Sequence, residues 1–177
     1  MPRLIHLNGP PGIGKSTLAA LYADRAPGIL NLDVDVVHRL VGGWADENNR
    51  TWDLVWPVVH AMAATHLGGG HDVVVPQYHA RPDEIATLEG LAHRHQASFH
   101  EVILLDGREA AAERFARRAG ATDDPWIRHH HLSRARLDAL YDDLLRLSEA
   151  RPDAVVVPST ADAVEATYEL LLAKLPL

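Results

Sequence analysis

The chain contains no cysteine among its 177 residues, and only 6% of them are aromatic. The absence of cysteine excludes a disulfide framework and a thiolate metal site. The sequence also lacks an apolar run near the roughly 18 residues that a membrane-spanning helix requires. Its first residues turn into a Gly-Pro segment too early for a signal peptide. We therefore expect a soluble cytoplasmic protein that does not associate with membranes.

A surplus of basic residues is missing as well. The chain has 17 lysines and arginines against 24 aspartates and glutamates, which gives a formal net charge of −7. Proteins that bind duplex nucleic acid normally carry a basic surplus, so we do not expect a nucleic-acid partner. Apolar residues account for 47% and charged residues for 23%, as in ordinary globular proteins. We expect one domain over residues 1–177, and nothing in the pattern predicts an oligomeric state.

Short apolar runs alternate with segments of helical pattern. The runs lie at residues 4–7, 29–32, 73–75, 102–105 and 155–157. Helices are predicted at 15–25, 36–41, 52–67, from Pro82 through Ala92, 109–119, 125–148 and 161–175. Pro57 is expected to kink or divide the third of these helices. Continuously apolar strands separated by helices predict an α/β fold, a three-layer sandwich on a five-stranded parallel sheet.

The first strand is followed by a glycine-rich loop. Residues 9–17 read GPPGIGKST and match the Walker A pattern G-x-x-x-x-G-K-[ST]. In such a loop the backbone N–H groups and the helix dipole face phosphate oxygens, the lysine reaches the β- and γ-phosphates, and the serine hydroxyl binds Mg²⁺. A glycine turn with a surface lysine explains the position between strand and helix less well. We assign nucleotide binding to Gly9, Gly12, Ile13, Gly14, Lys15, Ser16 and Thr17.

With this loop the chain resembles the small P-loop kinases, which include nucleoside monophosphate, shikimate and gluconate kinases and chloramphenicol phosphotransferase. The resemblance covers nearly the whole chain in element order, and its specific residues are 9–17, with weaker support at 33–35 and 114–118. It implies a sheet in the order 2-3-1-4-5 and transfer of the γ-phosphate of ATP, with Mg²⁺, to a small acceptor. It also implies a helical lid at about 114–133 and an acceptor-binding region at about 36–70.

Two carboxylates, Asp33 and Asp35, follow the second strand. Phosphoryl transfer to a hydroxyl needs alignment, charge neutralisation and a group that accepts the hydroxyl proton. We assign Asp35 to that catalytic role and to substrate binding, and Asp33 to a magnesium-bound water. Shikimate kinases carry a similar Asp-x-Asp here, and chloramphenicol phosphotransferase a Val-Asp pair similar to Val34-Asp35. Either acid can instead cap the following helix, a role compatible with substrate contact.

The third strand departs from the general P-loop pattern. It runs into Pro76-Gln77-Tyr78-His79, without the acid that many P-loop proteins place at a strand end. This departure disfavours a vigorous ATPase or motor and suits a small kinase. We expect Gln77 and Tyr78 to contact the acceptor or a phosphate. Arg81 is a candidate for an anionic substituent or simply a solvated arginine, and His79 is expected to be an ordinary loop histidine.

The region 36–70 contains three of the four tryptophans, Trp44, Trp52 and Trp56. Trp52 and Trp56 are four residues apart, so they share one helix face. They either form a wall for a ring-bearing or apolar acceptor or fill the core. His38 and Arg39 closely follow the candidate base. The candidate substrate ligands in this region are Trp56, His38 and Arg39.

Three arginines, Arg114, Arg117 and Arg118, lie on one side of a predicted helix end. Guanidinium groups suit phosphate oxygens and neutralise charge in the transition state. Lid arginines of similar small kinases also follow the fourth strand. We assign catalysis to Arg114 and Arg118, with Arg128 as a further candidate, against the alternative of a solvated helix face. Consecutive helical residues point about 100° apart, so His129, His130 and His131 do not share a metal ion.

These assignments predict a phosphotransferase acting on an alcohol group of a small molecule, such as an antibiotic or another specialised metabolite. The main alternative is a nucleotide-binding switch or a resistance protein that sequesters a ligand without phosphorylating it. The missing acid after the third strand favours that alternative, and the pair Asp33 and Asp35 disfavours it. A polynucleotide 5′-hydroxyl kinase needs a basic groove, which the net charge of −7 disfavours.

Overall fold

The computed structural model describes the chain except residues 47, 49, 122–128, 130–131, 161–162 and 176–177. The strands are β1 (Arg3–Asn8), β2 (Leu30–Asn31), β3 (Val73–Pro76), β4 (Ser98–Leu105) and β5 (Val155–Pro158). The helices are α1 (Lys15–Asp24), α2 (Val34–Arg39), α3 (Thr51–Gly68), α4 (Pro82–Arg94), α5 (Arg108–Gly120), α7 (Arg134–Ala150) and α8 (Val164–Lys174). None of the described helices is long and apolar enough to cross a bilayer.

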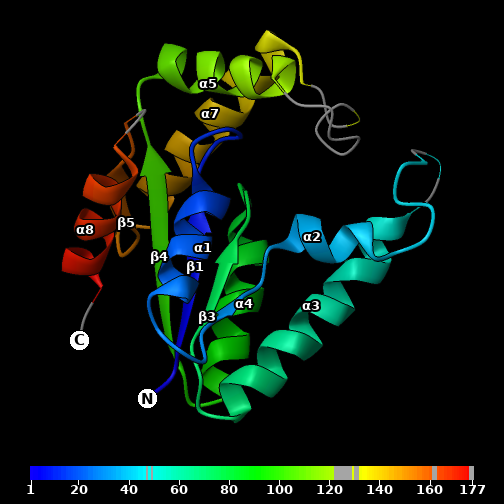
Figure 1. The fold of residues 1–177 in the computed structure, drawn as a ribbon, viewed down its shortest axis with the longest axis vertical. Helices are drawn as coiled ribbons and strands as arrows, with labels where there is room; N and C mark the ends of the chain where they lie inside the picture. The colour runs from blue at the N-terminus through cyan, green and yellow to red at the C-terminus, as the bar shows by residue number, and fades with distance from the viewer. Residues whose placement is uncertain (47, 49, 122–128, 130–131, 161–162, 176–177) are drawn as a thin grey trace.

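The five strands form one parallel sheet in the order β2-β3-β1-β4-β5, which confirms the predicted topology. Strand β1 occupies the centre because its residues pair with β3 on one side and β4 on the other. All carboxyl ends therefore meet at one edge of the sheet. Figure 1 shows α5 crossing beyond the carboxyl end of β4, at that edge.

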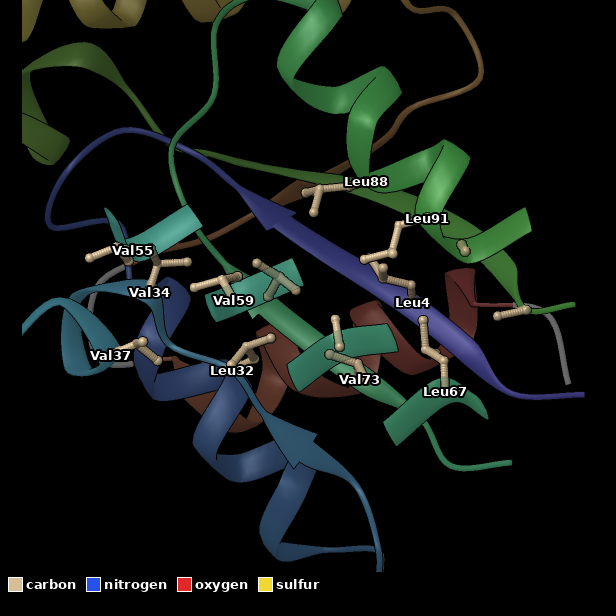
Figure 2. Packing of buried hydrophobic residues seen from close by; sticks show 14 residues of the cluster. Leu4, Leu32, Val34, Val37, Val55, Val59, Leu67, Val73, Leu88 and Leu91 are labelled. Atoms are coloured by element: carbon tan, nitrogen blue, oxygen red, sulfur yellow. The ribbon is translucent and has the colours of Figure 1, made fainter. Parts of the chain in front are cut away.

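Helices cover both faces of the sheet, which gives the predicted three layers. Along β1 the side chains alternate between them: Leu4 packs with α3 and α4, and Ile5 packs with α1 and α8. Figure 2 shows the first of these clusters, where Leu67 of α3 lies beside Leu4. Helix α7 joins the same face as α4 through a smaller cluster. Each residue of β1 is thus assigned to one layer by the two-residue period of a strand.

Several elements differ from the sequence prediction by a few residues, and the differences at α3 and β4 have a clear physical reason. Pro57 does not divide its helix, because α3 is continuous from Thr51 to Gly68. Its buried residues Val55 and Val59 flank the proline, and their packing on the sheet compensates for one missing backbone hydrogen bond. Strand β4 begins at Ser98, four residues earlier than predicted, because its largely polar first half pairs with β1 along residues 3–6. Alternating polar residues concealed that half from a search for apolar runs.

A buried ion pair lies on the α4 and α7 side of the sheet. Glu101 of β4 is 5% exposed, and its Oε2 accepts a hydrogen bond from Nε of Arg151. Arg151 also contacts Glu89 of α4, with 3.2 Å between Nη2 and Oε2. Burial raises the pKa of Glu101, and the guanidinium opposes that effect. The charge on this carboxylate therefore depends on Arg151.

We predict that Arg151→Met lowers the free energy of unfolding by about 3–5 kcal/mol, because it leaves a buried carboxylate without its cation. A buried acid with a raised pKa is tolerated when protonated, so the loss should grow as the pH rises from about 5 to about 8. Urea denaturation at both pH values measures this. The double variant Glu101→Gln/Arg151→Met should recover most of the stability and lose the pH dependence. An equal loss at both pH values would contradict this account.

Candidate functional site

The loop after β1 is held in a shape that only glycine permits at two places. A Cβ on Gly9 would lie 2.7 Å from the backbone oxygen of Leu104, so the loop passes directly over β4. Gly14 has a φ of 108°, in the left-handed region, and is the N-cap of α1. This turn brings the chain from the carboxyl end of β1 directly into the helix.

The start of α1 is built to face an anion. Gly14 has no side chain that could cap the helix. The first hydrogen bond of the helix runs from the backbone nitrogen of Leu18 to the backbone oxygen of Gly14, at 3.0 Å. The N–H groups of the first turn therefore have no partner within the helix. Ser16 and Thr17 are exposed in this turn. Unpaired N–H groups and the positive end of the helix dipole together favour a phosphate group here.

The side chain of Lys15 is hydrogen-bonded to the first residues of the phosphate loop. Its Nζ donates hydrogen bonds to the backbone oxygens of Gly9, at 2.7 Å, and Pro10, at 3.1 Å. Burial lowers the pKa of the amine to about 8, and the carboxylates of Asp35 and Asp33 oppose that change. The lysine is thus a partly desolvated cation, which binds anions more strongly than a fully hydrated one.

Asp33 and Asp35 lie at the carboxyl end of β2, close enough to Lys15 to act on its charge. Asp33 is the N-cap of α2, and its Oδ1 accepts a hydrogen bond of 3.0 Å from the backbone N–H of Asp35. This cap fixes the first turn of α2 and with it the position of Asp35, which lines the large cavity beside the phosphate loop. Asp33 thus caps the helix, and Asp35 of the same pair belongs to the site.

The side chains present here fit Mg²⁺, which prefers oxygen ligands and retains water. The hydroxyl of Ser16 lines the cavity at the start of α1. The carboxylates of Asp33 and Asp35 lie close enough to Lys15 to act on its charge. Within the described residues no cluster of three or more histidines or carboxylates is arranged to hold a metal by protein groups alone. The donor set suits an ion held jointly by phosphate, water and Ser16.

A cavity of about 670 Å³ opens beside the phosphate loop, large enough for a drug-sized molecule. Its lining combines two charged side chains, Lys15 and Asp35, with an aromatic wall formed by Trp52 and Trp56. The cavity is lined by Pro11, Gly12, Gly14, Lys15, Ser16, Thr17, Asp35, Trp52, Trp56, Pro76, Gln77, Tyr78, His79, Glu84, Phe115, Arg118, Leu132 and Arg136. The predicted residues Trp56, Gln77 and Tyr78 are therefore brought together with the phosphate loop.

Three predicted substrate ligands do not line this cavity. His38 is buried behind Trp52, with 4.0 Å between ring centroids, and its Nε2 lies 2.7 Å from Oγ1 of Thr51. Arg39 is exposed on α2. Arg81 is exposed and pairs with Glu84, at 3.1 Å. His38 thus supports the aromatic wall rather than forming its surface.

A second cavity, of about 380 Å³, is also lined by residues of the phosphate loop. Its lining includes Ile13, Thr17 and Ser159, and Oγ of Ser159 donates to the backbone oxygen of Ile13 at 2.9 Å. Arg114 also lines this cavity, where Nη2 lies 3.0 Å from Oδ2 of Asp106 and Nη1 donates to the oxygen of Ser159 at 2.9 Å. Arg114 therefore joins the ends of β4 and β5 on this side.

Arg118 is the predicted arginine that lines both cavities, and it lies at the end of α5. Of the predicted lid at 114–133, the structure describes residues 114–121, 129, 132 and 133. Arg128, His130 and His131 lie outside the described residues. A cation shared by the two cavities is placed to contact a group that passes between them.

Two site residues were not identified from the sequence. Asn8 is fully buried, and its Oδ1 accepts from the backbone N–H groups of Gly9, at 2.9 Å, and His79, at 3.0 Å. Its Nδ2 donates to the backbone oxygen of His79 at 2.8 Å. His79 is 5% exposed, lines the large cavity and packs on Trp56. The signal missed in the sequence was a polar residue at the very end of an apolar strand.

Comparisons with known proteins place these features in a family. A family model described as an AAA domain matches residues 4–147. The cytidylate kinase of Thermosipho melanesiensis is 49% identical over 49 residues, which are 28% of this chain and 22% of that kinase. The chain therefore matches only about a fifth of the length of this curated relative.

Two solved structures show the same fold over nearly the whole chain. The tunicamycin resistance protein of Deinococcus radiodurans has a TM-score of 0.68 and 16% identity, covering 100% of this chain and 97% of its own. A gluconokinase from Sinorhizobium meliloti 1021 has a TM-score of 0.64 and 21% identity, covering 97% of this chain and 90% of its own. The fold is that of the small P-loop kinases.

We predict that Asn8→Ala lowers the free energy of unfolding by about 2–4 kcal/mol, because it leaves three buried backbone groups without a partner. Urea denaturation measures the change. Asn48→Ala is the matched control, since Asn48 is exposed and its change should stay within about 0.5 kcal/mol. Equal changes in the free energy of unfolding for the two variants would contradict a stabilising role of the Asn8 hydrogen bonds.

Proposed function

The chain belongs to the AAA-domain family whose model matches residues 4–147, and from that premise we propose that it is a kinase of a small molecule. It transfers the γ-phosphoryl group of ATP to a hydroxyl of an acceptor that occupies the large cavity. The single observation that carries this proposal is the meeting of Lys15, Ser16 and Asp35 with an aromatic wall in one cavity. A protein that only hydrolysed nucleotide would have no use for a second organic binding site of about 670 Å³.

The two cavities suit the two substrates. The nucleoside of ATP occupies the smaller cavity, between Arg117 and the loop after β5, and its phosphates cross the phosphate loop. The acceptor lies against Trp52 and Trp56, with its hydroxyl toward Asp35. This placement puts the γ-phosphate between the two molecules, so that attack and departure are in line.

The reaction forms one bond and breaks one. The acceptor oxygen attacks the γ-phosphorus, a new P–O bond forms, and the bond from that phosphorus to the bridging oxygen of ADP breaks. Asp35 accepts the hydroxyl proton and later returns it to water. Lys15 and Arg118 neutralise the charge on the transferring group. Ser16, with Asp33 acting through water, would hold Mg²⁺, which screens the phosphate oxygens.

The charged side chains of the cavity indicate the charge of the acceptor. Besides Lys15, Arg118 and Asp35, the cavity is lined by one further cation, Arg136, and one further carboxylate, Glu84, so its polar groups are of mixed sign. This balance favours an uncharged or weakly charged molecule with a ring over a doubly charged phosphate monoester. The fold is shared with a gluconokinase and with a tunicamycin resistance protein. A sugar acid and an antibiotic are therefore both suitable acceptors to test first.

A protein that binds nucleotide and sequesters a ligand without phosphorylating it is the second candidate. The loop Pro76–His79 contributes no acid to the cavity, which is the observation that favours this candidate. The test is a transfer assay with γ-labelled ATP, Mg²⁺ and a pool of metabolites and antibiotics, with Lys15→Ala as the control. Label transferred to a small molecule by the wild type alone establishes the kinase and identifies its acceptor. Tight binding of ATP without transfer to any acceptor supports the sequestering protein.

We predict that Asp35→Asn lowers kcat by about 10²–10⁴-fold while the Kd for ATP changes less than about threefold, because the amide keeps the shape but accepts no proton. Lys15→Ala should abolish transfer and weaken ATP binding together. Single-turnover kinetics and calorimetry separate the two effects. Asp46→Asn is the control, since Asp46 is exposed and outside the cavity. Full turnover by Asp35→Asn would remove the assignment of the base.

A second prediction concerns the proton on Lys15, whose pKa burial lowers to about 8. Above that pH part of the amine is neutral, and phosphate groups beside it favour the charged form, so binding of ATP should take up protons. At about pH 8.5 the heat of binding should therefore differ between buffers of low and high ionisation enthalpy. Lys15→Arg should show no such uptake, because a guanidinium stays charged. Equal heats in both buffers for the wild type would contradict the lowered pKa.

A further inference from the structure

The backbone of His79 is hydrogen-bonded to Asn8, the residue directly before the phosphate loop. The side chain of Asn8 binds both the N–H and the C=O of His79, at 3.0 and 2.8 Å. The same amide oxygen binds the N–H of Gly9. The position of the His79 ring is therefore fixed relative to the loop that would hold the transferring phosphate.

The adjacent His6 has a tautomer that its contacts determine. Its Nε2 lies 3.0 Å from the backbone oxygen of Gln77, and a carbonyl oxygen only accepts hydrogen bonds. His6 therefore carries its proton on Nε2. Its Nδ1 is buried without a partner, which costs less for a bare nitrogen than for an N–H. Burial lowers the pKa of His6 to about 3, so the ring is neutral near neutral pH.

The tautomer of His79 follows from that of His6. Nδ1 of His79 lies 3.2 Å from Nε2 of His6, which already carries a proton. His79 must therefore accept at Nδ1, and as a neutral ring it holds its own proton on Nε2. Burial, with the charges of His60 and Arg81, lowers the pKa of His79 to about 4. The pair is thus uncharged, with both protons at defined atoms.

The remaining nitrogen of His79, Nε2, is not enclosed by protein groups. Its Nε2 has no hydrogen bond to any described residue, and it is not among the fully buried polar atoms. The ring lines the large cavity and packs on Trp56, with 5.2 Å between centroids. An N–H donor beside an aromatic wall is the arrangement that ligand cavities use to fix orientation.

We propose that the His6–His79 pair presents the Nε2–H of His79 as a fixed hydrogen-bond donor to the acceptor, which binds as a ring on Trp56 with a carbonyl, ether or ring-nitrogen atom facing that donor. The inference rests on the proposed function and narrows its substrate class. It also excludes His79 as the catalytic base, since its Nε2 is already protonated. His79 determines specificity, and His6 is a positioning residue that acts through it.

The first test needs no acceptor and is independent of kinase activity. Histidine labelled with ¹⁵N gives long-range ¹H–¹⁵N spectra that distinguish the tautomers, and two of the twelve histidines are assigned from the variants His6→Gln and His79→Gln. We expect both rings to be neutral and protonated on Nε2 near neutral pH. A proton on Nδ1 of His79, or a charged His79 ring at neutral pH, overturns the proposal.

The second test uses the acceptor that the labelled-ATP assay identifies. His79→Leu should lower kcat/KM for that acceptor at least about tenfold, the loss of one hydrogen bond, and leave the KM for ATP unchanged. His79→Gln, whose amide still donates, should recover part of the loss. His71→Leu is the control, because His71 is exposed and outside the cavity.

The two tests separate the possible failures. An acceptor phosphorylated equally well by His79→Leu overturns the substrate class and leaves the proposed function intact. An acceptor without a hydrogen-bond-accepting atom on its ring would likewise overturn the substrate class and leave the proposed function intact. Failure of the wild type to transfer phosphate to any acceptor removes the proposed function, and the spectra then decide by themselves whether the fixed donor exists.

Discussion

The arrangement of the site depends on one buried carboxamide. The side chain of Asn8 satisfies three backbone groups at once, one at the start of the phosphate loop and two in the loop after β3. These loops lie about seventy residues apart in the chain, and adjacent strands bring them together at one edge of the sheet. The desolvation of a buried amide is offset only when all of its hydrogen bonds are made, so these bonds hold the two loops in one relative position. The phosphate end and the acceptor end of the site therefore form a single rigid unit.

Electrostatics around Lys15 complete that unit. The amine is desolvated by the loop that it closes and is supported by the carboxylates of Asp35 and Asp33. Asp33 serves the fold and the site together, because its helix cap fixes the first turn of α2 and thus places Asp35. A change at Asp33 would therefore alter both the geometry of the candidate base and the charge of the lysine. Stability and chemistry are not separable at this position.

The fold and the glycine-rich loop that begins the site were predictable from sequence, and the contacts that line the rest of the cavity were not. The loop 9–17 and the alternation of apolar strands with helices are local patterns, and they led to the confirmed sheet order. The role of Asn8 is a contact between distant segments, which no local pattern reveals. His38 was expected at the acceptor because it follows Asp35 closely, but the helical turn directs it behind Trp52. His79 lies in a loop, as expected, but its burial against Trp56 of α3 is a contact between distant segments, which no local pattern reveals.

Helix α3 lies between the core and the large cavity. Val55 and Val59 are fully buried in the core, and Trp52 and Trp56, three residues before each of them, line the cavity and also pack against that core. Side chains three residues apart are neighbours on a helix, so the core contacts and the cavity wall share one side of α3. A library that varies these two tryptophans would therefore change the cavity and the packing of α3 together, and its members would have to be screened for stability as well as for the molecule that they bind. Lys15 and Ser16 lie on a separate helix, α1, and such a library would leave them in place.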